Sequence, residues 1–124
     1  MTNAQKAEQV IQKYGFEFDT IPKSEIRKLI EEEIANYQYG GSSEYIRLLC
    51  GYLFCIGDES DIELIDGAKH ISFDVGCMVD SEWIDSLKNG GKAKEQGYLR
   101  SREELIRDFI SYYTDFEADD DDEY

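Results

Sequence analysis

Apolar residues recur at helical spacing along most of the chain. After Thr2, a candidate N-cap, Ala4, Ala7, Val10, Ile11 and Tyr14 follow a helical period, and Gly15 comes at a position where helix ends favour glycine. A second stretch of the same kind begins at Pro22 or Ser24 and extends to Tyr37. The pattern therefore predicts that the chain begins with two amphipathic helices.

The segment 45–56 has a different pattern, because only Arg47 and Gly51 interrupt its apolar residues. A helix that is apolar on nearly all sides is normally buried, so we predict that this segment is the central helix of the fold. A buried strand is the alternative, but the length of the segment and the preceding Ser42 or Ser43 favour a helix. The segment is too short to cross a bilayer, which takes about 20 apolar residues.

Two shorter helices are predicted next. The first follows Asp58 or Ser60 as N-cap and has a narrow apolar stripe. A single helix over residues 74–88 would place Asp80 on its apolar side. We therefore predict a break there, with Asp80 or Ser81 as the N-cap of a short helix that ends at the following Asn-Gly-Gly.

The last predicted helix has the clearest start. Ser101 and Glu104 have the spacing of a capping box, and apolar residues recur from there to Phe116. The residues that follow are mostly carboxylates, which repel one another and cannot bury apolar area. We therefore expect a single helical domain over residues 1–116 and a disordered acidic tail over residues 117–124.

The predicted fold class is all-α, with five or six helices. Helices joined by short turns that contain glycine usually form antiparallel hairpins. A layered, HEAT-like stack of such hairpins is one arrangement they could take, although the sequence has no repeat of fixed period.

The net charge of the chain adds most to what the helical pattern predicts. The chain has 28 acids and 13 Lys or Arg residues, which gives a formal net charge of −15. Seven of the acids and no base lie in residues 115–124. The other 21 acids still exceed the 13 bases, so the helical domain is acidic as well. Such a charge repels nucleic acid and anionic membranes, and it attracts basic proteins. We expect neither a nucleic-acid ligand nor a membrane, but a basic protein partner.

The cysteines and the N-terminal residues indicate the compartment. The three cysteines lie in largely apolar segments, and their odd number favours reduced, buried thiols over a disulfide framework. The first residues lack the apolar core of a signal peptide. We therefore expect a cytoplasmic protein.

Candidate chemistry is sparse. His70 and Cys77 could form a nucleophilic pair, but the acidic surroundings would raise the pKa of the thiol and oppose thiolate formation. One histidine and no Cys-x-x-Cys give no zinc site, and the acid-rich segment from Asp58 has Ile62 where a calcium loop needs glycine. No glycine-rich phosphate loop is present, and nothing marks out two of the carboxylates as a catalytic pair. We expect no cofactor and no enzymatic activity.

What remains is a concentration of carboxylates over two or three predicted helices, which we interpret as a protein-binding face. Trp83 lies among these acids and has two interpretations, a core residue or an aromatic anchor of the interface. The predicted partner-binding residues are Asp58, Glu59, Asp61, Glu63, Asp66, Asp74, Asp80, Glu82, Trp83 and Asp85.

As a small, acidic, single-domain chain without a catalytic constellation, the protein resembles the immunity proteins that neutralise bacterial polymorphic or contact-dependent toxins. Many of these toxins are basic nucleases. The resemblance implies an inhibitor that binds a basic toxin domain and occludes its active site. Two alternatives stay open, a DNA mimic that inhibits a nucleic-acid-binding protein and a helical adaptor in a protein complex.

Overall fold

The protein is all-α, as predicted. A computed structural model describes residues 3–35, 44–71, 81–88 and 101–114, and these residues contain six α-helices and no strand. The α-helices are α1 (Asn3–Tyr14), α2 (Lys23–Ala35), α3 (Glu44–Ile56), α4 (Ile62–Lys69), α6 (Ser81–Lys88) and α7 (Arg102–Thr114). Two short 3-10 turns are η1 (Phe18–Thr20) and η2 (Glu59–Asp61). The predicted tail lies outside the described residues.

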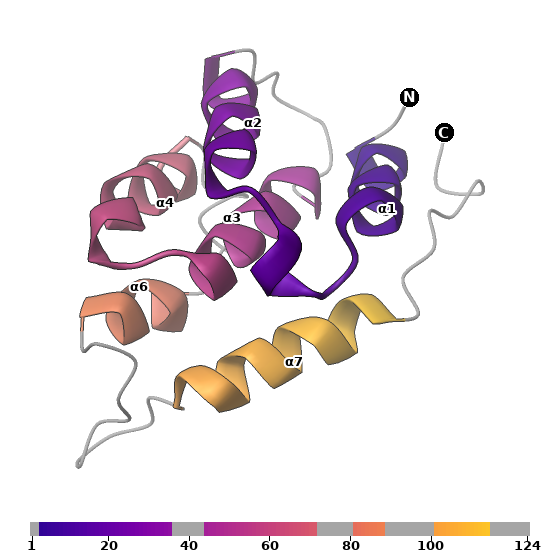
Figure 1. Cartoon of the computed structure of the whole chain (residues 1–124). Helices are drawn as coiled ribbons and strands as arrows, with labels where there is room; N and C mark the ends of the chain where they lie inside the picture. The colour runs from indigo at the N-terminus through magenta and orange to yellow at the C-terminus, as the bar shows by residue number, and fades with distance from the viewer. Residues whose placement is uncertain (1–2, 36–43, 72–80, 89–100, 115–124) are drawn as a thin grey trace.

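Helix α3 is the centre of the fold, as its apolar sequence predicts (Figure 1). Every residue from Leu48 to Cys55 is buried. Helices α1, α2, α4 and α6 all contact α3, and α7 runs across one side of the bundle (Figure 1). The helices therefore surround one central helix.

The helix ends that local sequence predicts are present. Gly15 has φ +62°, and its N–H donates to the carbonyl of Ile11 at 2.8 Å, which closes the end of α1. Asp58 caps η2 by accepting the N–H of Ser60 at 2.8 Å. At the start of α7, the hydroxyl of Ser101 accepts the N–H of Glu104 at 3.3 Å.

Side-chain hydrogen bonds fix α3 to its neighbours. The buried Tyr52 donates its hydroxyl hydrogen to the carbonyl of Gly15 at 2.8 Å, so the end of α1 is held against the middle of α3. Arg102 of α7 donates to the carbonyls of Cys55 at 2.8 Å and Gly57 at 3.3 Å. Its cation therefore lies at the C-terminal end of α3, where the helix dipole favours positive charge.

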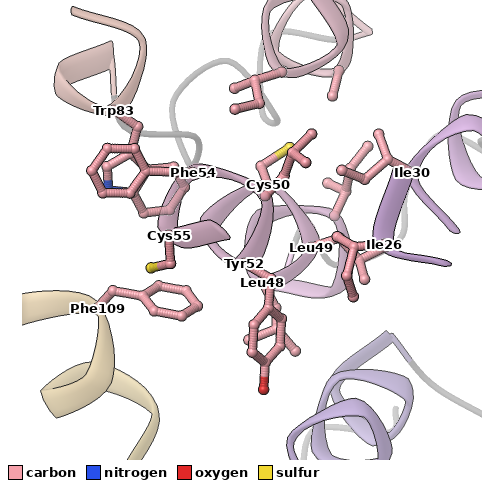
Figure 2. Close-up of a cluster of buried hydrophobic side chains, with 14 of the residues drawn as sticks. Ile26, Ile30, Leu48, Leu49, Cys50, Tyr52, Phe54, Cys55, Trp83 and Phe109 are labelled. Carbon is pink, nitrogen blue, oxygen red and sulfur yellow. The ribbon is translucent and has the colours of Figure 1, made fainter. Parts of the chain in front are cut away.

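Helix α7 packs against α3 at Gly51. The ring of Phe109 is buried in the aromatic core that Figure 2 shows, 5.7 Å from the ring of Tyr52 between centroids. A Cβ atom at Gly51 would lie 2.1 Å from Cε1 of Phe109, much closer than a van der Waals contact. Only glycine lets α7 approach this closely.

We expect Gly51→Ala to reduce the free energy of unfolding by about 1–3 kcal/mol, because Phe109 would have to leave its place in a packed core. Gly67→Ala is the matched control. A Cβ atom at Gly67, in α4, would meet nothing within 4 Å, so the change should be neutral or stabilise the helix by up to about 1 kcal/mol. Urea unfolding followed by circular dichroism measures both, and equal effects would contradict this account of the α3–α7 contact.

Candidate protein-binding surface

The surface formed by η2 and α4 carries a group of exposed carboxylates. Asp58, Glu59, Glu63 and Asp66 are all exposed, and they lie within nine consecutive positions of the sequence. Ile65 and Ala68 on the opposite side of α4 are buried in the core. The amphipathic pattern of α4 therefore turns its carboxylates outward, toward solvent.

The basic groups near this surface are few among the described residues. Lys69 is half-buried at the end of α4, and His70 follows it. The Nδ1 atom of His70 lies 2.7 Å from the carbonyl oxygen of Asp66 and 3.4 Å from its carboxylate. Neither Glu59 nor Glu63 forms an ion pair with another of the described residues. Their charges are thus available to a partner.

Asp58 is exposed but also has a structural role. Its carboxylate accepts hydrogen bonds from both the hydroxyl and the N–H of Ser60, at 2.6 and 2.8 Å, and these bonds lower the pKa of Asp58. Lys23 of α2 lies 3.6 Å from the same carboxylate. Replacing Asp58 would therefore disturb the start of η2 as well as the surface charge.

Asp61 does not belong to the exposed face, which corrects the sequence-based assignment. Its side chain is fully buried, and its carboxylate pairs with Lys23 at 2.6 Å and with the guanidinium of Arg27. It also accepts the N–H of Asp58 at 2.9 Å, which completes a capping box. A buried carboxylate needs such partners, and here they join η2 to α2. The Asp-x-x-Asp spacing was the local signal for this role.

Trp83 is a core residue and not an aromatic anchor of the interface, which decides between the two interpretations of its sequence position. Only 2% of its surface is exposed. Its ring stacks on Phe54 with a centroid distance of 6.0 Å and meets the edge of Phe109 at 5.9 Å (Figure 2). Buried in this way, Trp83 cannot contact a partner directly.

The remaining predicted residues are less informative. Glu82 and Asp85 are half-buried on α6, which packs against α4. Asp74 and Asp80 lie outside the described residues. The described part of the predicted face is therefore the η2–α4 surface, with α6 beside it.

Another aromatic residue is exposed instead of Trp83. Tyr112 of α7 is 49% exposed, and its ring lies 4.3 Å from the guanidinium of Arg47. Its hydroxyl donates to the carboxylate of Glu44 at 2.8 Å. No local sequence pattern predicts this arrangement, because Arg47 and Glu44 come from a helix distant in the chain. Tyr112 lies on α7 and does not extend the η2–α4 surface.

The described residues offer little for nucleophilic or metal chemistry. Burial raises the pKa of the Cys50 and Cys55 thiols to about 12, even though Arg102 lowers that of Cys55. Both cysteines are free and buried, as the sequence predicts for them. Cys77, the proposed partner of His70 in a nucleophilic pair, lies outside the described residues. No group of three or more His, Cys, Asp or Glu side chains in the described ranges could hold a metal ion.

Comparisons with known proteins do not add to this description. No family model matches the chain, and no curated protein or solved structure does either. Among the described helices, none has both the length and the apolar composition needed to cross a membrane. Functional inference therefore depends on the surface itself.

We expect Asp61→Asn to reduce the free energy of unfolding by about 1–3 kcal/mol, because Lys23 and Arg27 would lose the anion that they share. The cost stays moderate because both cations are partly exposed to water. Asp66→Asn, at an exposed carboxylate, should change stability by less than about 0.5 kcal/mol. Urea unfolding measures both, and similar values for the two variants would disprove a structural role for Asp61.

We also expect Cys50 and Cys55 to resist alkylation in the folded protein. A thiol with a pKa of about 12 has roughly a thousandfold less thiolate at pH 8 than an ordinary cysteine. In a Cys77→Ser variant, iodoacetamide should therefore label the chain only after unfolding in urea, as followed by mass spectrometry. Rapid labelling of either cysteine under native conditions would show that α3 is not buried as described.

Proposed function

We propose that this protein is an immunity protein, which binds a basic bacterial toxin domain through the exposed carboxylates of η2 and α4. The observation that carries the proposal is the exposure of Asp58, Glu59, Glu63 and Asp66 along the consecutive elements η2 and α4. Like charges held together on a surface repel one another, and a basic partner relieves that repulsion.

The burial of Asp61 restricts the proposed surface to the exposed carboxylates. Its charge is already neutralised by Lys23 and Arg27 within the fold, so it adds little to the field outside. The exposed carboxylates remain, and they could pair with the Lys and Arg side chains that a nuclease uses to hold substrate phosphates. Inhibition would then follow from occlusion of the substrate site.

The net charge supports the same kind of partner. A chain with a formal charge of −15 should associate quickly with a basic domain at low salt, and more slowly as salt screens the charges. The resemblance to toxin immunity proteins in size and acidity agrees with this proposal. The resemblance also suggests that the partner is a toxin domain, such as a basic nuclease.

A test needs variants that change the surface and spare the fold. The face variant is Glu59→Lys, Glu63→Lys and Asp66→Lys, which leaves the capping residue Asp58 and the buried Asp61 intact. The control variant replaces three exposed acids on other elements, Glu17, Glu31 and Glu103, by lysine. Both variants change the net charge by the same amount, so a difference between them reports on position.

We expect the tagged chain to capture a basic protein from its native host, and the purified partner to lose affinity for the face variant by roughly ten- to thousandfold. The control variant should bind within a few-fold of the unmodified chain, and binding of both should weaken near ~0.5 M salt. Calorimetric titration measures these affinities, and thermal unfolding checks that both variants are folded.

The inhibitory step is tested with the same partner. Cleavage of RNA or DNA by the captured protein should stop when the unmodified chain is added in equal amount, and should continue with the face variant. A partner that is bound but stays active would indicate an adaptor instead. Capture of several DNA-binding proteins that duplex DNA displaces would indicate a DNA mimic, and equal affinities of the two variants would exclude the η2–α4 surface.

A further inference from the structure

A groove of about 400 Å³ lies between α1 and α2, on a part of the surface that the proposed function does not use. Its apolar lining includes Val10 and Leu29, and the rings of Tyr14 and Tyr45 also line it. Three lysines, Lys6, Lys13 and Lys28, border it as well. A groove of this kind offers apolar contact together with positive charge.

The lysines are available for binding. The ammonium of Lys6 lies 5.5 Å from the ring centroid of Tyr45, and that of Lys13 lies 5.1 Å from the ring centroid of Tyr14. No ion pair joins Lys6, Lys13 or Lys28 to another residue in the described part of the chain. In a chain where acids outnumber bases by more than two to one, this grouping of unpaired cations is unusual.

Two carboxylates also border the groove, and they limit what it could hold. Glu25 accepts the hydroxyl hydrogen of Tyr14 at 3.2 Å, and Glu32 lies further along α2. Three ammonium groups against two carboxylates give a small positive excess. With only one net positive charge in its lining, the groove suits an acidic ligand that also has apolar surface and is held by many weak contacts.

The end of α7 lies close to this groove. Tyr112 and Tyr113, at the end of α7, both donate hydroxyl hydrogens to the carboxylate of Glu44, at 2.8 and 3.0 Å. The next residue, Tyr45, lines the groove and contacts Lys6. Figure 1 shows the C-terminal end of α7 on the same side of the molecule as α1. The last turn of α7 is thus hydrogen-bonded to the residue that precedes the groove-lining Tyr45.

We propose that the α1–α2 groove binds the acidic segment of this same chain, residues 115–124. This segment has seven carboxylates, no base and two aromatic residues, Phe116 and Tyr124, which is the chemistry that the groove suits. Ten residues span at most about 35 Å when extended, enough to reach along a groove that begins near the end of α7. The short tether gives an effective concentration of the order of millimolar, so weak contacts suffice.

This inference goes beyond the proposed function and does not depend on it. When the segment occupies the groove, its carboxylates neutralise the three lysines. The groove then adds no positive charge to the surface that a basic partner meets. The η2–α4 carboxylates are unaffected, because they lie on other elements.

The test compares two variants of the full chain by the backbone amide NMR signals of groove residues such as Val10, Leu29 and Tyr45. The tail variant replaces Asp119, Asp120, Asp121 and Asp122 by asparagine. The control variant replaces four exposed acids outside the segment, Glu17, Glu31, Glu59 and Glu103, by glutamine. Both remove the same charge, so only a specific contact distinguishes them.

We expect the tail variant to shift the groove signals toward the positions that the unmodified chain shows near ~0.5 M salt. The control variant should leave the groove signals in place, apart from those beside its own substitutions. In a background of Lys6→Gln, Lys13→Gln and Lys28→Gln, the tail substitutions should no longer move the groove signals, because the two sites act through one interaction.

Groove signals that do not respond to the tail variant, or respond equally to the control variant, would overturn the proposal. Shifts that grow with protein concentration would also overturn it, since they would mean that the segment of a second copy fills the groove. None of these outcomes bears on binding of a basic partner at η2 and α4.

Discussion

Helix α3 is apolar on almost every side, so the other helices have to cover it on every side. Helices α1, α2, α4 and α6 contact it, and Phe109 of α7 reaches it at Gly51. The large apolar area that these contacts remove from water is the main stabilising contribution to such a fold.

Covering α3 also determines which polar groups have to be satisfied inside. The carbonyls of Cys55 and Gly57, at and just beyond its C-terminal end, receive hydrogen bonds from Arg102. Arg47, its one basic residue, donates to the hydroxyl of Tyr113 at 2.7 Å and lies over the ring of Tyr112. Both arginines thus keep their charge near the surface while their side chains help to attach α7.

The same constraint separates the carboxylates into two classes. Asp61 lies where η2 packs against α2, so it is buried and needs Lys23 and Arg27. The acids on the outer side of α4 stay in water and keep an unneutralised field. The exposed acidic surface is therefore smaller than the number of acids suggests, but it is better defined. The groove between α1 and α2, which three lysines border, lies on another part of the molecule and has a small positive excess.

The sequence by itself determined the helical class, the central place of residues 45–56 and the helix ends at Gly15, Asp58 and Ser101. These features depend on side-chain period and on hydrogen bonds between residues at most four positions apart, so a linear pattern records them. It also indicated that an acidic face lies after Asp58.

Only the tertiary structure decided which members of that face are available. Arg27 is 34 residues from Asp61, and no local pattern indicates that the two meet. Trp83 has acids beside it in sequence but the rings of Phe54 and Phe109 around it in space. The groove likewise exists only because α1 and α2 both pack against α3. Burial and charge pairing depend on neighbours in space, and those are set by how the helices cover α3.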